Sequence, residues 1–343
     1  MNIENLMRKN IRSLRPYEAK EIKCRVKLDA NESPYSFPEL LEKALSVKTN
    51  RYPDPEGLAL KKAASRQWKI PPENLLLGNG SDELIYYLIL TFGGPVIFPE
   101  PTFSMYGIIS KAIGVKAVGI KLDKNFDLDT EKFLSAIKKH KPKLIFLSNP
   151  NNPTGNCFST DRIFEIIRAT KALVVVDEAY QPFSSKNGFI PLLHEMENLV
   201  IMRTLSKIGF AALRVGFLIS SADIIKAVNR VRLPFNLNSL SQTVAIEVFK
   251  NYRRIMKTVK EICKERDRLY KALEQLPGVM PHPTEANFIL FRVGNASRVH
   301  RALLKKGVLI RNMTPLIKDA LRVTIGNPEE NNLFLKALEA VIK

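Results

Sequence analysis

Some segments of the chain are continuous runs of hydrophobic residues, and others carry hydrophobic residues at helical spacing. The alternation of these two patterns predicts an α/β fold. The runs "KLIFLSNP", "ALVVVDEAY" and "NLVIMRTLSK" are apolar without alternating polar positions. Strands of this kind are buried on both faces, as in a parallel sheet covered by helices. Residues 130–141 and 161–171 instead carry apolar side chains at helical spacing. We therefore expect a large domain with a mostly parallel central sheet flanked by helices.

The pattern changes after "LPFNLNSLS", where we expect a second, smaller α+β domain. Residues 242–276 are amphipathic throughout and predict one extended helix, and shorter strand and helix patterns follow it. The sequence thus predicts an N-terminal arm that joins the small domain, a large domain that contains the central sheet, and a small C-terminal domain. Their expected ranges are 1–30, 31–235 and 236–343.

Composition narrows the class of protein. The chain has 45% hydrophobic and 25% charged residues, which are ordinary globular values. The formal charge of +19 comes from basic residues that are scattered at helical spacing, which is typical of solvated helix faces. A nucleic-acid surface would need them clustered on one face, so we expect small anionic substrates and no nucleic-acid partner.

The spacing of the cysteines and the length of the apolar runs indicate the cellular compartment of the protein. Cys24, Cys157 and Cys263 are widely spaced, which favours a reducing compartment and argues against a metal site. The first residues lack the apolar core of a secretion signal, and no run reaches the length of about 18 apolar residues that crosses a membrane. These features predict a cytoplasmic protein that does not associate with membranes.

Polar residues follow the predicted strands at their carboxyl ends, where open α/β sheets bind ligands. Asp177 follows three consecutive valines, and burying its carboxylate is costly without a cationic partner. Lys207 ends another apolar run, and a lysine in a dry pocket can act as a nucleophile. The further candidates at these ends are Tyr180, Thr204, Ser206 and Arg214.

A glycine turn in "GNGSDE" precedes a predicted helix. We expect this helix to open at Ser81, with the hydroxyl as its cap and Asp82 in its first turn. The free N–H groups of a helix N-terminus suit a phosphate. Pyridoxal 5'-phosphate (PLP) has a phosphate, a ring nitrogen that an acid such as Asp177 can pair with, and an aldehyde that a lysine such as Lys207 can bond to. The candidate residues therefore favour PLP as the cofactor.

Several motifs resemble those of one enzyme family. "LDANESP", "RYPDP", "GNGSDE", "NPNNPTG", "DEAY", "PFNLNSLSQ" and "RVTIG" occur in the order used by fold-type I, PLP-dependent aminotransferases, over nearly the whole chain. "LDANE", "RYPDP" and "GNGSDE" are similar to those of the histidinol-phosphate aminotransferases. The resemblance implies a transaminase of histidine biosynthesis that converts L-histidinol phosphate and 2-oxoglutarate into imidazole acetol phosphate and L-glutamate.

The resemblance also implies a role for each cofactor-site residue. Lys207 would form the Schiff base and move the proton, and Asp177 would pair with the ring nitrogen. Tyr180 and Asn152 would hydrogen-bond the ring oxygen, while Phe103 would stack on the ring. The phosphate would be held by Ser81, Asp82, Thr204, Ser206 and Arg214, although the interval from Lys207 to Arg214 is one residue shorter than in most relatives.

Substrate contacts are implied in the same way. Arg322 would bind the substrate α-carboxylate, a bidentate task that suits arginine. Tyr17, Asn31, Tyr52 and Arg311 would complete the substrate site. The tyrosine of "RYPDP", Tyr52, reaches the neighbouring subunit's site in this family, which implies a homodimer.

Other activities on this scaffold stay open at this point. A threonine-phosphate decarboxylase and an aromatic-amino-acid aminotransferase share most of these motifs. A nucleic-acid-binding protein on a vestigial enzyme fold would need an added DNA-binding segment, for which the short N-terminal arm leaves no room.

Overall fold

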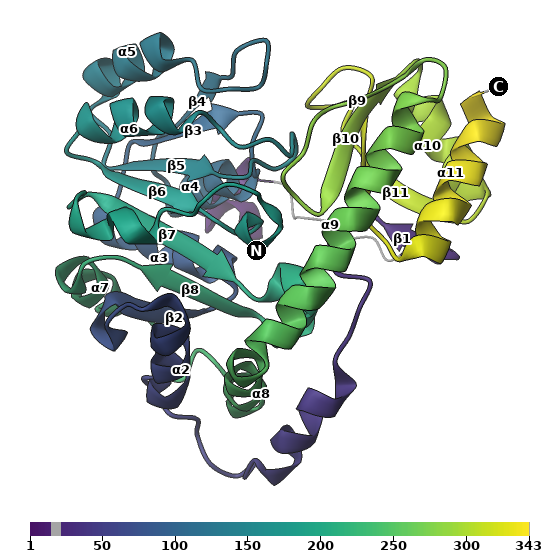
Figure 1. Cartoon of the computed structure of the whole chain (residues 1–343). Helices are drawn as coiled ribbons and strands as arrows, with labels where there is room; N and C mark the ends of the chain where they lie inside the picture. The colour runs from purple at the N-terminus through teal and green to yellow at the C-terminus, as the bar shows by residue number, and fades with distance from the viewer. Residues whose placement is uncertain (15–21, 343) are drawn as a thin grey trace.

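Two β-sheets organise the chain in the computed structural model, which describes residues 1–14 and 22–342 (Figure 1). The larger sheet has seven strands in the order β2-β8-β7-β6-β5-β3-β4. In that order its strands are Leu75–Asn79, Val215–Ile219, Leu199–Thr204, Leu173–Asp177, Leu144–Ser148, Val96–Glu100 and Ala117–Lys121.

Five neighbouring strands of this sheet, from β4 to β7, are parallel, and the predicted mostly parallel sheet is confirmed. β8 runs antiparallel to both of its neighbours, β7 and β2. The three apolar runs singled out in the sequence form β5, β6 and β7. Their carboxyl ends therefore lie together at one edge, as the site prediction requires.

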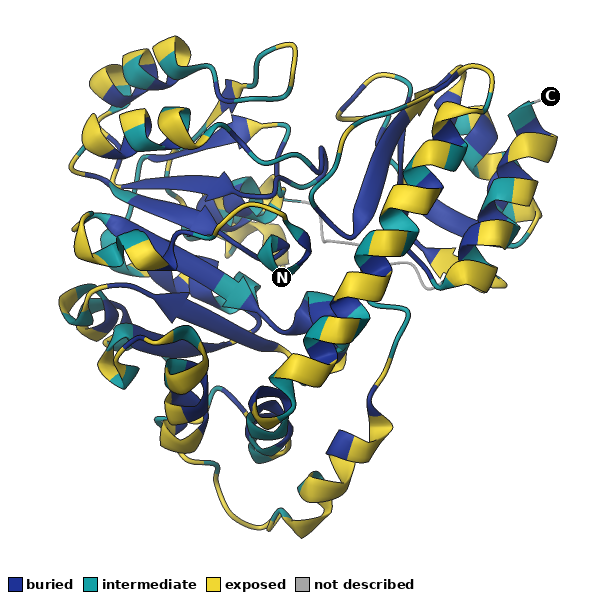
Figure 2. Cartoon of the chain, viewed as in Figure 1, coloured by how far each residue is buried: buried dark blue, intermediate teal, exposed yellow. Residues whose placement is uncertain are grey.

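Helices cover both faces of the larger sheet, which explains why its strands are apolar on both sides (Figure 2). In β5, Leu144 and Phe146 pack on one face while Ile145 and Leu147 pack on the other. α3 (Ser81–Phe92), α4 (Met105–Ile113) and α7 (Ala222–Asn229) cover the first face. The second is covered by α2 (Leu58–Trp68), α5 (Thr130–His140), α6 (Thr160–Arg168) and α8 (Ser239–Lys250).

The smaller sheet has the strand order β1-β11-β12-β10-β9. β1 runs parallel to β11, and the other neighbours are antiparallel. α10 (Ala296–Lys305) and α11 (Pro328–Ile342) pack together beside it (Figure 1). Its strands, in sheet order, are Val26–Leu28, Val308–Asn312, Ala320–Thr324, Phe288–Val293 and Val279–Pro281.

The N-terminal residues reach both parts of the molecule. β1 joins the smaller sheet, whereas α1 (Lys9–Arg12) lies against α4. There the side chains of Arg8 and Asn10 donate hydrogen bonds to the carbonyl groups of Ile113 and Lys111. The domain boundaries at residues 30 and 235 stay predictions.

The long helix expected over residues 242–276 is two helices, so this prediction was wrong. α8 ends at Lys250, and α9 (Tyr252–Glu274) then runs across to the smaller sheet (Figure 1). The break is at Asn251, whose backbone leaves helical geometry (φ −101°, ψ 15°). Its side-chain amide donates to the carbonyl of Glu247, a local bond that competes with helix continuation.

The expected cap of α3 also needs correction. The helix begins at Ser81 as predicted, but the N-cap residue is Gly80 and no side chain caps it. Gly80 has φ 81° and ψ 169°, a conformation that is essentially restricted to glycine. The hydroxyl of Ser81 therefore lies one position inside the helix, where it is not used as the cap.

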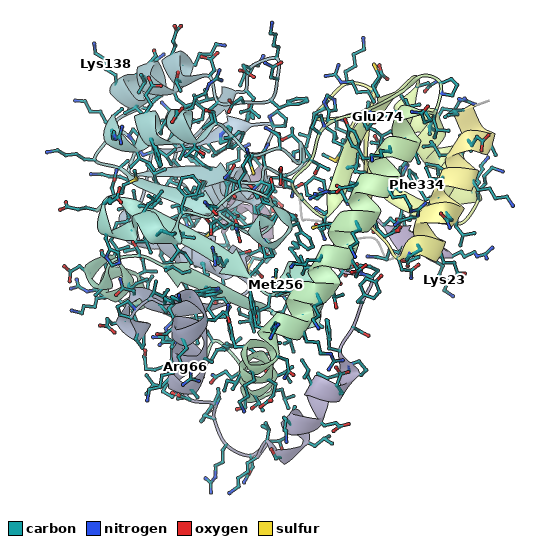
Figure 3. The ribbon with its side chains drawn as sticks, in the orientation of Figure 1. Lys23, Arg66, Lys138, Met256, Glu274 and Phe334 are labelled. Atoms are coloured by element: carbon teal, nitrogen blue, oxygen red, sulfur yellow. The ribbon has the colours of Figure 1, made fainter. Side chains whose placement is uncertain are left out.

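Basic side chains spread over the outer helix faces, as the helical spacing suggests. Figure 3 shows Lys138 on α5 and Arg66 on α2 pointing away from the larger sheet, and both are exposed. Within the two described segments, no helix combines the length and the apolar character that a membrane crossing needs.

Candidate active site

The carboxyl ends of β5, β6 and β7 open into a cavity of about 80 Å³ beside the N-terminus of α3. All ten residues predicted to contact the cofactor line this cavity. They are Ser81, Asp82, Phe103, Asn152, Asp177, Tyr180, Thr204, Ser206, Lys207 and Arg214. Ser148 and Ala179, which the sequence did not predict as site residues, line it too.

Asp177 is the last residue of β6, and its carboxylate is almost fully buried, with 3% of the residue exposed. One oxygen accepts the backbone N–H of Ala179 at 3.1 Å, and the other accepts the hydroxyl of Tyr106 at 2.7 Å. Burial raises the pKa of Asp177 to about 6, against the lowering effect of these bonds and of Lys207. A cationic group in the cavity would restore the ionised form.

Tyr106 is a site residue that sequence reasoning missed. It lies in the first turn of α4, is completely buried, and stacks on Phe146 with ring centroids 4.8 Å apart. Burial, together with the nearby Asp177, raises its pKa well above the ordinary tyrosine value, so the phenol stays a donor. Its position three residues after Phe103, whose ring it contacts at a centroid distance of 5.6 Å, is the available signal.

Lys207 follows β7 in a short helical turn, Ser206–Phe210, and is partly buried. Its ammonium nitrogen lies 5.6 Å from the centre of the Tyr180 ring, which is itself buried. Just before it, the hydroxyls of Thr204 and Ser206 are hydrogen-bonded to each other at 2.9 Å. The turn thus brings an amine and two hydroxyl groups to one wall of the cavity.

Arg214 lies at the N-terminus of α3, although the loop that carries it is short. Its backbone is left-handed (φ 52°), and its guanidinium donates to Asp82 at 3.1 Å. The guanidinium also packs against Gly80, where a Cβ atom would overlap it. Because 45% of its side chain is exposed, this cation can still meet an anion at the helix N-terminus.

Tyr180 is held by a residue from the N-terminal part of the chain. The side-chain amide of Asn31 donates to the Tyr180 hydroxyl at 2.9 Å. Asn31 is 1% exposed and has a left-handed backbone (φ 56°), which asparagine tolerates better than most residues. Asn31 therefore lies directly behind the phenol on the cavity wall.

Arg322 comes from β12 of the smaller sheet and is buried beside the cavity. Its guanidinium donates to the side-chain oxygen of Asn152 at 2.5 Å and to the backbone oxygen of Asp29 at 2.8 Å. Arg311 pairs with Arg322 across β11 and β12, and directly opposed residues of antiparallel strands share a face. Arg311 is exposed, whereas Arg322 is buried, and Arg311 does not line the cavity.

One predicted substrate residue, Tyr52, lies away from the cavity. Tyr52 does not line the cavity; it is 82% exposed and stacks on Phe235 with ring centroids 4.6 Å apart. Tyr17 lies outside the described residues. No grouping of three or more histidine, cysteine or acidic side chains in residues 1–14 and 22–342 could hold a metal ion.

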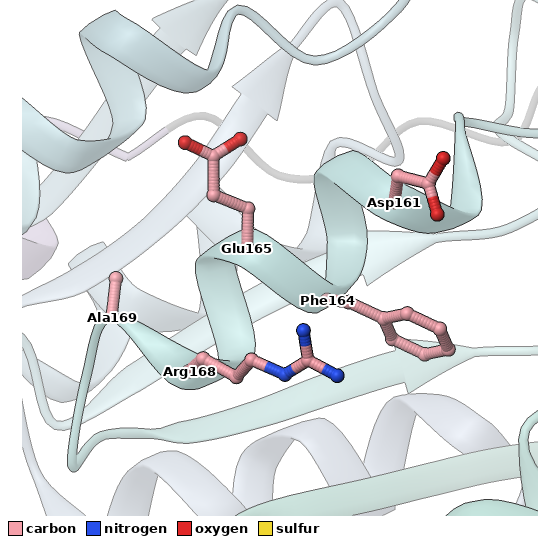
Figure 4. A pocket seen from close by; sticks show the side chains of 5 residues that line it. All are labelled: Asp161, Phe164, Glu165, Arg168 and Ala169. Carbon is pink, nitrogen blue, oxygen red and sulfur yellow. The ribbon is translucent and has the colours of Figure 1, made fainter.

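A second hollow lies on the outer side of α6 and lacks these features (Figure 4). Phe164 and the oppositely charged Glu165 and Arg168 line it, and the Arg168 guanidinium lies 5.7 Å from the Phe164 ring centre. None of the strand-end residues reaches it, so the chemistry is concentrated at the strand ends.

Comparisons with known proteins agree with this site. The family model "Aminotransferase class I and II" matches residues 24–338. A histidinol-phosphate aminotransferase of Aquifex aeolicus is 44% identical, and the match covers 97% of each chain.

Solved structures show the same fold. The histidinol-phosphate aminotransferase of Sinorhizobium meliloti, solved in complex with pyridoxal-5'-phosphate, has a TM-score of 0.88 at 24% identity, covering 98% of this chain and 97% of that one. An L-threonine-O-3-phosphate decarboxylase of Porphyromonas gingivalis has a TM-score of 0.80 at 22% identity, covering 92% and 98%. The predicted fold-type I architecture is confirmed. By its sequence matches, the chain belongs to the class I and II aminotransferases and, within them, to the histidinol-phosphate aminotransferases.

Proposed function

We propose that the protein binds PLP and transfers an amino group from L-histidinol phosphate to 2-oxoglutarate, giving imidazole acetol phosphate and L-glutamate. The observation that carries the proposal is one cavity that combines Lys207, the buried Asp177 carboxylate, and Arg214 at the N-terminus of α3. An amine, an acid and an anion site are the three groups that an aldehyde, a ring nitrogen and a phosphate require.

The residues present fit this cofactor. Asp177 is buried with a raised pKa, and a protonated ring nitrogen is a cation that favours its ionised form. At the phosphate end, two glycines allow Arg214 and the neighbouring strand to lie close to the N-terminus of α3. A Cβ atom on Gly216 would come within 2.8 Å of the backbone nitrogen of Ser81, and one on Gly80 would overlap Arg214.

The other cavity residues would hold the cofactor in place. The backbone N–H groups of Ser81 and Asp82 would bind its phosphate, because they belong to the first turn of α3 and need acceptors. Phe103 would stack on the ring, and Tyr180 and Asn152 would hydrogen-bond the ring oxygen. The phosphate contacts are completed by the Thr204 and Ser206 hydroxyls and the Arg214 guanidinium.

The chemistry divides between cofactor and chain. When bound, PLP supplies an electron-withdrawing ring that stabilises the charge left when the substrate Cα loses its proton. The amine of Lys207 would anchor the cofactor and then, once displaced, take that proton and deliver it. Asp177 would keep a proton on the ring nitrogen, which is the form in which the ring withdraws electrons best.

Substrate recognition would depend on the arginine pair. Arg322 would bind the α-carboxylate of glutamate or 2-oxoglutarate in a bidentate contact. Arg311 lies across from it on the same sheet face, and two adjacent cations suit the dianionic phosphate of histidinol phosphate. Tyr17 and Tyr52 would supply further hydrogen bonds to this phosphate.

We further propose that the protein is a homodimer in which Tyr52 enters the neighbouring subunit's site. The proposal is supported by the exposure of Tyr52 and its stacking partner Phe235, since exposed aromatic side chains mark interaction surfaces. We also propose a cytoplasmic location, because the three cysteines are free thiols, as a reducing compartment favours.

The test is a reaction of the purified protein with histidinol phosphate and 2-oxoglutarate. We expect glutamate to form, together with a visible absorbance band of the bound cofactor that Lys207→Ala removes along with the activity. Carbon dioxide release from threonine phosphate without glutamate formation would show a decarboxylase instead. A band that persists in Lys207→Ala would contradict the role of Lys207.

A further inference from the structure

We propose that Asn31 and Thr324 are positioning residues that direct the hydrogen of the Tyr180 hydroxyl into the active-site cavity. The proposal rests on the proposed function, because the acceptor in the cavity would be the ring oxygen of PLP. It also changes the expected role of Asn31, which the sequence placed among the substrate contacts.

The hydrogen-bond network includes one group that can only donate, the backbone N–H of Asn31. The backbone N–H of Asn31 donates to the Thr324 hydroxyl oxygen at 2.9 Å. The Thr324 hydroxyl then has its own hydrogen to give, and the side-chain oxygen of Asn31 lies 3.3 Å away. This donation fixes the orientation of the Asn31 amide, so that its NH₂ group faces Tyr180.

The amide orientation decides the direction of the phenol. Tyr180 accepts from the Asn31 NH₂ group at 2.9 Å, and this is the one hydrogen bond that its hydroxyl makes to any residue in the described part of the chain. A phenol has a single hydrogen, which is therefore left for an acceptor in the cavity that Tyr180 lines. A donor held in this way stabilises negative charge on the acceptor.

Burial and a further hydrogen bond hold the Asn31–Thr324 network in place. Asn31 and Thr324 are both almost fully buried, and the backbone oxygen of Asn31 accepts the side-chain amide of Asn287 at 3.1 Å. Thr324 lies two residues after Arg322 on β12. The same strand thus carries the arginine proposed to bind the carboxylate and the hydroxyl that orients the Asn31 amide.

Asn31→Asp provides the sharpest test. It keeps the size of the side chain and tolerates the left-handed backbone, but its carboxylate offers Tyr180 an acceptor in place of a donor. The phenol would then turn its hydrogen away from the cavity. Asn31→Ala only removes the donor, and Thr324→Val removes the hydroxyl that orients the amide.

The measurement is the PLP dissociation constant by equilibrium dialysis of the holoenzyme, together with a pH titration of its visible absorbance. We expect Asn31→Ala and Thr324→Val to weaken PLP binding by about 3- to 10-fold, the range of one hydrogen bond, and Asn31→Asp to weaken it more. In a Tyr180→Phe background, all three effects should disappear, because the hydroxyl they act on is gone.

Asn331→Asp serves as the matched control. Asn331 lies on α11 and is also almost fully buried, and its side-chain amide donates hydrogen bonds to Glu265 and Gly326. This variant therefore reports the general cost of a buried Asn→Asp change. We expect lower thermal stability with unchanged PLP binding and an unchanged absorbance titration.

Two results would overturn the proposal. In the first, Asn31→Asp binds PLP as well as or better than Asn31→Ala. In the second, the losses persist in full when Tyr180 is phenylalanine, which would indicate a merely structural role. If wild-type protein bound no PLP, the proposed function itself would fail, and that outcome is distinct from either of these.

Discussion

At the scale of single residues, Tyr106 is the side chain that donates a hydrogen bond to the buried carboxylate of Asp177, and this bond lowers the pKa of Asp177. Burial favours the protonated form of an acid, whereas a hydrogen bond donated to its oxygen favours the ionised form. Tyr106 supplies that bond from a completely buried position, with an oxygen-to-oxygen distance of 2.7 Å. Tyr106 is therefore the residue whose removal should change the titration of Asp177 most directly.

We predict that Tyr106→Phe raises the pKa of Asp177 above about 6 in protein freed of PLP. Because the pKa of Asp177 is higher in the folded protein than in the unfolded chain, its protonation stabilises the folded state. This stabilisation is complete below the ordinary pKa of 3.8 and is lost as the pH rises through the folded-state pKa. For wild type this loss totals about 3 kcal/mol, of which about 2 kcal/mol falls between pH 4 and 6. In Tyr106→Phe the loss should be larger and should extend to higher pH.

Urea unfolding of wild type, Tyr106→Phe and Asp177→Asn at several pH values measures this effect. Asp177→Asn removes the titrating group and provides the baseline that cancels all other acids. Phenylalanine keeps the stacking contact with Phe146, so the ring packing is conserved. Identical pH profiles for wild type and Tyr106→Phe, each taken relative to that baseline, would show that the bond does not tune Asp177.

Some residues of the candidate site could be predicted from the sequence, and others could not. Lys207 and Asp177 were identifiable because each follows an apolar strand at the edge where ligands bind. Tyr106 and the orientation of Asn31 were not, because their partners lie 71 and 149 residues away in the chain. Contacts of that kind depend on how the helices and the N-terminal segment pack, which a local pattern does not contain.

At the scale of elements, α3 is bounded by a glycine at each end. Gly80 at the N-cap (φ 81°, ψ 169°) and Gly93 at the C-cap (φ 72°, ψ −148°) both have backbones that other residues rarely adopt. Their surroundings differ, because a Cβ atom on Gly80 would overlap the Arg214 guanidinium whereas nothing lies within 4 Å of one on Gly93. The pair separates backbone strain from the function of the helix N-terminus.

We predict that Gly80→Ala and Gly93→Ala each lower the free energy of unfolding by about 1–3 kcal/mol through backbone strain. Only Gly80→Ala should also weaken PLP binding, by about 10- to 100-fold, because it displaces the arginine that would bind the phosphate. Equilibrium dialysis and urea unfolding measure the two effects separately. Equal PLP affinities in the two variants would contradict a phosphate site at this helix end.

Elements were predictable where the hydrophobic pattern was long and uniform. β5, β6 and β7 follow from runs without polar alternation, since such runs are buried on both faces. The boundary between α8 and α9 did not follow, because the amphipathic spacing continues through Asn251. At this position the side-chain amide of Asn251 donates to the carbonyl of Glu247, and hydrophobic periodicity carries no information about such local bonds.

At the scale of the whole molecule, the cavity draws on segments from the entire chain. The larger sheet supplies Asp177 to its wall, and the turn after β7 supplies Lys207. Behind the wall, Arg322 of β12 donates to the lining residue Asn152, and Asn31 of the N-terminal part donates to Tyr180. Tyr52 does not line the cavity and lies on the surface beside Phe235. A residue that is exposed in its own subunit can still complete a site if a second subunit lies against it.

Mixed dimers test whether Tyr52 acts in its partner's site. We expect Tyr52→Ala and Lys207→Ala homodimers each to be strongly impaired, because every site in them lacks one group. A mixed dimer, isolated with a different affinity tag on each variant, has one site with the Lys207 of one chain and the Tyr52 of the other. We predict about half of the wild-type activity per dimer, since one of two symmetric sites is complete. If Tyr52 served its own subunit, neither site would be complete and the mixed dimer would be no more active than its parents.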